Sequence, residues 1–309
     1  MPAFTVEKFI DVNASAEKAF DTVADFITWT TWSPWLRIEP DAKVTVSDDP
    51  RSVGSMYAWT GELVGQGQMT HSQLDRPSRI ESDLLFRKPF RSQSRVTFSI
   101  EPQGEQSRIR WIMNGSLPWF MFWMRPMMET YVGMDYERGL KMLKELIETG
   151  TVHSQVEVRG ITELEARCVA GVRAQCHLSQ IGPRMTEIFQ TVHQAMPSEL
   201  CNGERLSVYH AVDLKTGHTD FTGGFTVRET ADPAAPLSKL QLPACRALHL
   251  RHTGGYPNLG NAWSGAYQYA RHKKIRLARG AACLEVYRSD PEKTPDSDLV
   301  TDIYLPVRS

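Results

Sequence analysis

The chain has 309 residues, a length typical of two domains of ordinary size. Hydrophobic residues make up 41% of it and charged residues 23%, so each half can build a core. A net charge of −1 lacks the basic excess that general binding of nucleic acid needs, and no apolar run approaches the roughly 20 residues that span a bilayer. Five cysteines lie in the second half without a Cys-x-x-Cys pair, which predicts reduced thiols in a cytoplasmic protein.

The first half begins with a strand and a helix and then continues as a series of short strands. Residues 4–10 have the pattern of the strand, and Asn13-Ala14-Ser15 opens a helix over residues 16–26. Three tryptophans follow, at Trp29, Trp32 and Trp35. The alternation of apolar and polar residues then predicts six strands, near residues 42–46, 54–60, 66–73, 79–86, 92–101 and 106–114. A long helix over 126–149 closes this half.

This order of elements predicts one antiparallel sheet that curls around the long last helix and leaves a cavity between them. The motif Trp32-Ser33-Pro34-Trp35, together with Trp111-Ile112-Met113-Asn114-Gly115, resembles the polyketide-cyclase branch of the START-like (SRPBCC) superfamily. The resemblance covers about residues 4–149 and implies a hydrophobic-cavity domain over 1–150. Members of that superfamily bind lipids, hormones and polyketides, or act as cyclases. The only histidine here is His71, and no catalytic constellation is evident.

The second half repeats itself weakly. The segment Leu206–Asp213 resembles Leu284–Asp290. Upstream of each segment an extended run begins at a cysteine, Cys168 lying 41 residues before Tyr209 and Cys245 lying 42 before Tyr287. A helix is predicted between them in both copies, over about 182–196 and 257–273. The repeat therefore predicts two strands, a helix and two strands, present twice around a pseudo-twofold axis.

The residues of the second copy resemble the GyrI-like, effector-binding family. The motifs that carry the resemblance are Gly254-Gly255-Tyr256, the block Glu285-Val286-Tyr287 with Asp290-Pro291, and Asp302-Ile303-Tyr304-Leu305-Pro306. They imply a domain over 155–309. The whole chain is then an α+β protein, a helix-grip domain followed by a duplicated ββαββ domain.

A candidate ligand site follows from the alternation of strand side chains. Glu285 and Tyr287 share one face of a strand, and the resemblance implies that the strand carrying Tyr209 lies beside it. Trp263 and Tyr267 lie on one face of the second helix, and Tyr256 lies just before it. One carboxylate among aromatic rings suits a flat, apolar, cationic compound, and burial would raise the pKa of Glu285. The expected ligand-binding residues are Glu285, Tyr287, Tyr209, Trp263, Tyr256 and Tyr267.

Several functions are compatible with these residues. The first is binding of aromatic or hydrophobic small molecules by a sensor, carrier or sequestering protein, with no segment to spare for a DNA-binding domain. The second is hydrolysis of reactive cyclopropane-bearing compounds, which the GyrI-like resemblance implies, with Glu285 as the general base and Tyr287 or Tyr209 as the proton donor. A polyketide cyclase or dehydratase activity of the first half is a third, and a protein partner a fourth. We expect no cofactor and no metal, since His249 and His252 face opposite sides of a strand.

Overall fold

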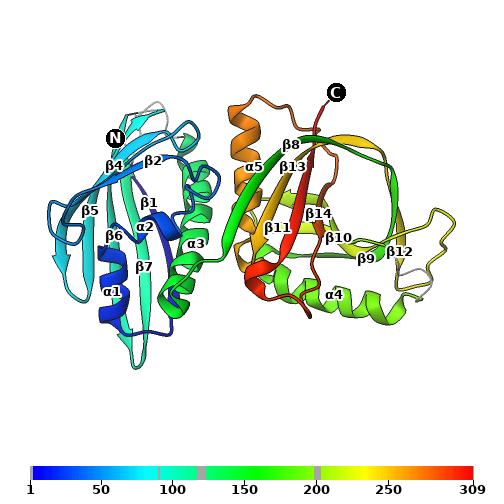
Figure 1. Ribbon diagram of the computed structural model, residues 1–309, viewed down its shortest axis with the longest axis horizontal. Coiled ribbons are helices and arrows are strands. Elements are labelled where there is room, and N and C mark those ends of the chain that lie inside the picture. The colour runs from blue at the N-terminus through cyan, green and yellow to red at the C-terminus, as the bar shows by residue number, and fades with distance from the viewer. Residues whose placement is uncertain (1–2, 90, 117–122, 198–202, 309) are drawn as a thin grey trace. The chain divides into compact units, whose positions relative to one another are not determined.

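The computed structural model describes residues 3–89, 91–116, 123–197 and 203–308. The chain divides into two compact units, Met1–Val152 and His153–Ser309 (Figure 1). Each described hydrophobic core cluster draws its residues from one unit alone. Over the described ranges, no helix has the length and apolar character needed to cross a membrane.

The first unit is built on a seven-stranded antiparallel sheet. Its strands follow one another in the order β1-β7-β6-β5-β4-β3-β2. Their bounds are β1 (Ala3–Val12), β2 (Lys43–Val46), β3 (Met56–Thr60), β4 (Gln66–Asp75), β5 (Arg79–Lys88), β6 (Ser92–Gln103) and β7 (Gln106–Ser116). The predicted strand, helix, six strands and long helix are confirmed, with a short extra helix after the first.

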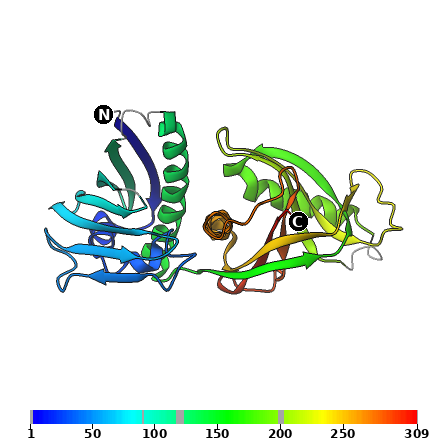
Figure 2. The same ribbon diagram turned by 90° about the horizontal axis from the view of Figure 1, so that it is seen from above.

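Three helices complete this unit: α1 (Ala16–Ala24), α2 (Trp29–Trp32) and α3 (Arg125–Thr149). The Ser15 hydroxyl caps α1 by accepting the Lys18 N–H at 3.3 Å. Gly150 ends α3 with a φ of 81°, a conformation that glycine adopts without strain. Figure 2 shows α3 lying along the sheet. Its buried face includes Tyr136 and Leu140, as the apolar spacing predicts.

Aromatic rings fill much of the space between the sheet and α3. Trp111 on β7 stacks on Tyr136 of α3 with 3.8 Å between ring centroids, and on Phe98 of β6 at 5.1 Å. Trp32 meets Trp111 edge-on at 5.4 Å, and Trp29 lies 4.8 Å from Trp32. These rings pack together as part of the hydrophobic core of the first unit. A recess of about 510 Å³ is lined by residues 83–85 of β5, 93–95 of β6 and 114–116 at the end of β7.

The second unit contains one eight-stranded antiparallel sheet in the order β12-β9-β11-β10-β14-β15-β13-β8. Its strands are β8 (Ser154–Leu164), β9 (Arg167–His177), β10 (Arg205–Asp213), β11 (His218–Val227), β12 (Ser238–Leu242), β13 (Cys245–Gly254), β14 (Cys283–Tyr287) and β15 (Val300–Pro306). Its helices are α4 (Ile181–Ala195) and α5 (Gly260–His272), with short 3-10 turns η2 (Leu178–Gln180), η3 (Tyr256–Asn258) and η4 (Asp296–Asp298).

The duplication predicted from the sequence is present, with one feature that the sequence does not reveal. The copies run β8-β9-α4-β10-β11 and β12-β13-α5-β14-β15, yet the first strand of each pairs with the other copy. Thus β8 borders β13, and β12 borders β9. The exchange joins the copies into one sheet, and β10 and β14 meet at its centre.

Gly223 on β11 lets α4 approach the sheet closely. A Cβ at this position would lie 2.8 Å from Cγ2 of Ile188 and 3.3 Å from Sδ of Met185, both on α4. These distances are shorter than ordinary van der Waals contacts, so any larger residue would push the helix away. The glycine thereby brings the side chains of α4 down onto the central strands.

We expect His252 to make the second unit less stable in acid. Its Nε2 lies 3.0 Å from the Ser154 hydroxyl, and burial lowers its pKa from 6.5 to about 4. The unfolded chain therefore binds a proton at a higher pH than the folded chain. The stability that comes from the neutral ring is present above 6.5 and is lost as the pH falls toward 4. Linkage puts this loss at up to about 3 kcal/mol.

The measurement is denaturant unfolding of the wild type and His252→Gln near neutral pH and at about pH 4.5. We expect the wild type to lose more stability between the two conditions than the variant. An equal loss in both proteins would show that another group governs the acid transition.

The two units should fold independently, because each has its own core. Expressed separately, residues 1–152 and 153–309 should each give a cooperative thermal transition and the circular dichroism of a mixed helix and sheet protein. If both pieces were unstructured, the division into two domains would be wrong.

Candidate ligand site

The central strands β10 and β14 present alternate side chains to one face of the sheet. Ser207 lies opposite Glu285, and Arg205 lies opposite Tyr287. Since residues two apart in a strand share a face, Tyr209 joins this set. The faces of α4 and α5 toward the sheet supply the remaining neighbours, so the set lies at the pseudo-twofold axis between the two copies.

Three neutral donors converge on the carboxylate of Glu285. The Tyr209 hydroxyl donates to Oε2 at 2.9 Å, and the Tyr287 hydroxyl donates to the same oxygen at 2.8 Å. The indole N–H of Trp263 on α5 donates to Oε1. Glu285 is only 3% exposed. The carboxylate is therefore buried and hydrogen-bonded, but no cation of the described chain is paired with it.

Burial raises the pKa of Glu285 above its ordinary value of 4.5, and the hydrogen bonds from Trp263, Tyr287 and Tyr209 offset only part of this effect. Burial also raises the pKa of both tyrosines well above 10, so their hydroxyls stay protonated as donors. The site therefore combines one buried carboxylate with three neutral hydrogen-bond donors.

The pseudo-twofold relation explains the composition of the site. Equivalent positions of the two copies lie 78 residues apart. Met185 corresponds to Trp263, Ser207 to Glu285 and Tyr209 to Tyr287. The Met185 sulfur lies 3.2 Å from the Ser207 hydroxyl, just as the Trp263 indole contacts Glu285 in the other copy. One copy therefore supplies the charge and the indole, whereas the other supplies small or soft groups in the same places.

Aromatic rings surround the carboxylate. Trp263 meets Tyr209 edge-on with 5.3 Å between centroids, and Tyr256 of η3 meets Tyr287 edge-on at 5.6 Å. Four of the five aromatic residues expected from the sequence are thus in mutual contact or bonded to Glu285. Tyr267 is the exception. It lies on α5 with 49% of its surface exposed, and its side chain hydrogen-bonds the thiol of Cys283.

Three residues of this site were missed in the sequence, and Met185 of α4 is one of them. Phe189 on α4 contacts Tyr287 edge-on at 5.7 Å, and the guanidinium of Arg205 lies 3.9 Å from the Phe189 ring centroid. Phe189 lies 78 residues before Tyr267, so the repeat offset could have indicated it. Arg205 lies two residues before Ser207, on the same side of its strand.

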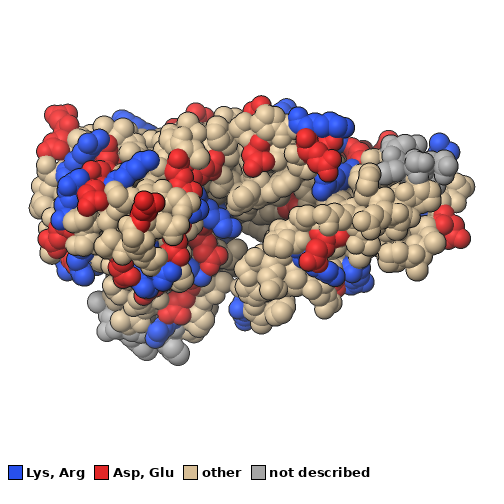
Figure 3. All heavy atoms as spheres, turned by 90° about the horizontal axis from the view of Figure 1, so that it is seen from below, with Lys and Arg blue, Asp and Glu red and all other residues tan. Residues whose placement is uncertain are grey.

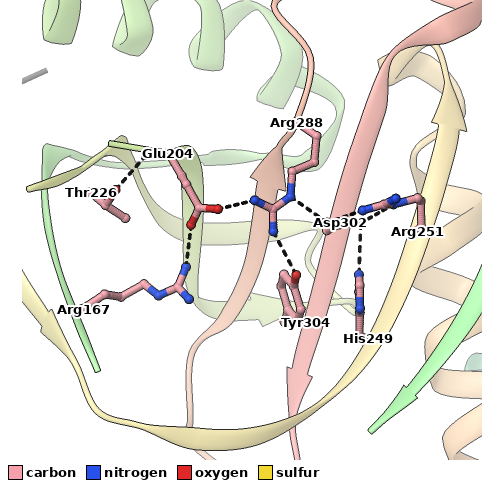
Figure 4. A network of polar contacts seen from close by, with 8 residues as sticks. All are labelled: Arg167, Glu204, Thr226, His249, Arg251, Arg288, Asp302 and Tyr304. Atoms are coloured by element: carbon pink, nitrogen blue, oxygen red, sulfur yellow. Dashed lines mark hydrogen bonds and ion pairs between the residues drawn. The ribbon is translucent and has the colours of Figure 1, made fainter. Parts of the chain in front are cut away.

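The opposite face of the sheet carries a separate polar network (Figure 4). Asp302, which is 1% exposed, accepts from Arg251 at 2.8 Å and from Arg288 at 2.7 Å, and His249 lies 3.0 Å away. Arg288 also reaches Glu204 and donates to the Tyr304 hydroxyl at 3.1 Å. Burial would raise the pKa of Asp302, but hydrogen bonds from His249 and the arginines hold it well below 3.8. Every acidic group here is paired, which marks the network as structural.

In the first unit, His71 is held by the fold. One ring nitrogen lies 2.9 Å from the Ser82 hydroxyl and the other 3.0 Å from the Ala24 carbonyl, and the ring stacks on Phe26 at 3.8 Å. Burial lowers its pKa. Across the described parts of both units, no group of three or more His, Cys, Asp or Glu side chains is placed to hold a metal ion.

The fold and this site define a two-domain protein, a helix-grip domain followed by a duplicated domain with a buried carboxylate on its axis. Residues 3–148 match the family model described as polyketide cyclase / dehydrase and lipid transport, and residues 160–308 match the GyrI-like small molecule binding domain. The first unit therefore belongs to the polyketide cyclase family, and the second is a small-molecule-binding domain of the GyrI-like family. No curated protein sequence matches the chain.

Three solved structures each match about half of the chain. SAV2435 bound to tetraphenylphosphonium is 16% identical over 50% of this chain and 94% of that chain, with a TM-score of 0.41. The EcmrR C-terminal domain is 21% identical over 50% of this chain and 98% of that domain, with a TM-score of 0.42. CalU16 from Micromonospora echinospora is 12% identical over 47% of this chain and 77% of its own, with a TM-score of 0.35.

Proposed function

We propose that the second unit binds flat aromatic compounds that carry a positive charge, and that the protein acts as a sensor, carrier or sequestering protein for them. The observation that carries this proposal is the buried carboxylate of Glu285, whose described partners are all neutral donors. A ligand cation would supply the missing positive charge. The rings of Trp263 and Tyr287 would add cation–π attraction of about 0.5–2 kcal/mol each.

Ligand entry requires some rearrangement, because the carboxylate is closed over in this structure. Trp263 and Tyr256 are each partly exposed, whereas Glu285 beneath them is not. Trp263 lies on α5 and Tyr256 lies in the short η3 segment before it. We infer that a ligand enters by moving these two rings. Its positively charged group would then contact the Glu285 carboxylate in place of the Trp263 indole N–H.

The direct test is a titration of the full chain with the methyl ester of a rhodamine, a planar dye with a fixed positive charge. We expect micromolar binding, seen as a change in dye fluorescence and in the heat of mixing. No signal up to the solubility limit of the dye would remove the proposal.

A hydrolase is the second candidate, and one observation favours it. Both Tyr209 and Tyr287 donate to the same oxygen of Glu285, and burial raises the pKa of that carboxyl above its ordinary value, which makes it a stronger general base. Incubation with a cyclopropane-bearing electrophile, followed by mass spectrometry, would show a product one water heavier. If product forms in the wild type but not in Glu285→Gln, hydrolysis replaces simple binding as the function of the site.

A cyclase or dehydratase activity of the first unit has less support. Both ring nitrogens of His71 are already engaged and its pKa is lowered, so it is poorly placed as a base. For the whole chain we propose a cytoplasmic location, which the four free described cysteines support. The proposed lack of a nucleic-acid partner is supported by Figure 3, where basic and acidic side chains are interspersed on the face drawn.

A further inference from the structure

Arg205 places a second charge beside the site, of the opposite sign to Glu285. It lies two residues before Ser207 on β10, on the helix-facing side of the sheet. Its guanidinium lies 3.9 Å from the ring centroid of Phe189 and 5.6 Å from that of Tyr287. A planar guanidinium on aromatic faces is held in place by cation–π attraction without using its hydrogen-bond donors.

Those donors have no partner within the described ranges. The Nε–H of Arg205 is buried and unpaired, and no ion pair or hydrogen bond of its guanidinium is found among the described residues. By contrast, Arg288 and Arg167 on the other face of the sheet both reach Glu204. A buried N–H without a partner costs about 1–3 kcal/mol, so a positively charged group left in this state favours a ligand that accepts from it.

The charges of Arg205 and Glu285 act on the same ring. Burial raises the pKa of Tyr256, Arg205 lowers it, and Glu285 raises it. Tyr256 therefore lies within reach of both charges. The carboxylate of Asp290 also senses Arg205, but it accepts the Glu292 N–H at 3.1 Å and pairs with Lys293 at 3.2 Å. Asp290 is exposed and engaged elsewhere, so it leaves the arginine available.

We propose that Arg205 is a specificity-determining residue that gives the site an anion-binding pole, so that its preferred ligand is an aromatic zwitterion rather than a plain aromatic cation. The ligand would place its positive end at Glu285 and a carboxylate, sulfonate or phosphate group at Arg205. A planar guanidinium suits such a group because it can donate two parallel hydrogen bonds. A plain cation would instead meet repulsion from Arg205 and would have to displace it from Phe189 and Tyr287.

This inference rests on the proposed function, and a matched pair of dyes tests the two separately. A rhodamine with a free carboxyl group is a zwitterion near neutral pH, and its methyl ester is a cation with the same rings. Both are titrated into the full-length wild type, Arg205→Gln, Arg205→Lys and Glu285→Gln, with thermal unfolding of each variant as the control for folding.

We expect the wild type to bind the free acid at least about tenfold more tightly than the ester. Arg205→Gln should abolish or reverse this preference. The variant should bind the free acid more weakly and should bind the ester as tightly as the wild type or more tightly. Arg205→Lys should keep part of it, since the charge remains but the planar pair of donors is lost. Glu285→Gln should weaken both dyes.

An unchanged acid-to-ester ratio in Arg205→Gln, or a wild type that prefers the ester, would overturn the role of Arg205. If the ester still bound in a manner sensitive to Glu285→Gln, the proposed function would survive that result. If neither dye bound to any of the proteins, both proposals would fail together.

Discussion

Asp302→Asn should lower the unfolding free energy of the second unit by about 3–5 kcal/mol, the range expected when one partner of a buried charge network is removed. Asp302 is 1% exposed and accepts from Arg251 and Arg288, and Nε2 of His249 lies 3.0 Å from its carboxylate. An amide cannot neutralise the two arginines, and its NH₂ group faces donors. The change should appear as a lower denaturant midpoint of the second unit, while the first unit unfolds as before.

The matched control is Asp220→Asn on the same sheet. Asp220 pairs with Arg173 at 2.7 Å, but 59% of the arginine side chain is exposed, so water already screens the pair. Its loss should cost under about 1 kcal/mol. Equal effects of the two substitutions would mean that the Asp302 network contributes no more than a surface ion pair.

Glu285→Gln should weaken binding of an aromatic cation by about 1–3 kcal/mol, roughly a 5- to 150-fold change in Kd, because the shape is kept and the buried charge is removed. Stability should change by less than about 2 kcal/mol. The carbonyl of the glutamine can accept from Trp263, and the hydroxyls of Tyr209 and Tyr287 can turn to accept from its NH₂ group.

Glu187→Gln serves as the control for charge alone. Glu187 is exposed on α4 and pairs with Arg184, so it shares the domain but not the site. Its substitution should leave dye affinity unchanged. A fall in affinity as large as that of Glu285→Gln would point to long-range attraction rather than to contact at the carboxylate.

The order of elements could be predicted almost completely from the sequence, because each element satisfies local rules. Ser15 and Gly150 mark helix ends, and the alternation in residues 92–101 marks a strand. The central site was accessible for a similar reason, since side-chain alternation places Glu285 and Tyr287 on one face whatever the rest of the sheet does.

Features set by long-range packing were not accessible. The exchange of β8 and β12 depends on which strand each of them pairs with. The local sequence of a strand does not determine its pairing partner. The three donors on Glu285 come from elements up to 76 residues away, so the sequence left the carboxylate unpaired. In the sequence Arg205 is an ordinary charged residue at the start of a strand. Its contact with Phe189 exists only because α4 packs against that strand in the folded domain. The stacking of Trp111 on Tyr136 in the first unit likewise joins elements that are distant in the sequence.

The central claim is that the charge of Glu285 selects the ligand, and one comparison tests it most directly. N-methylacridinium and methylanthracene have the same three-ring shape and differ in a single positive charge. Their affinities for the wild type and Glu285→Gln, measured by fluorescence titration, separate charge from shape. We predict that the substitution raises the Kd of the acridinium by at least about fivefold and changes the Kd of the anthracene by less than about twofold. Equal losses for both compounds would contradict the account, because they would show that Glu285 shapes the site without discriminating the charge of its ligand.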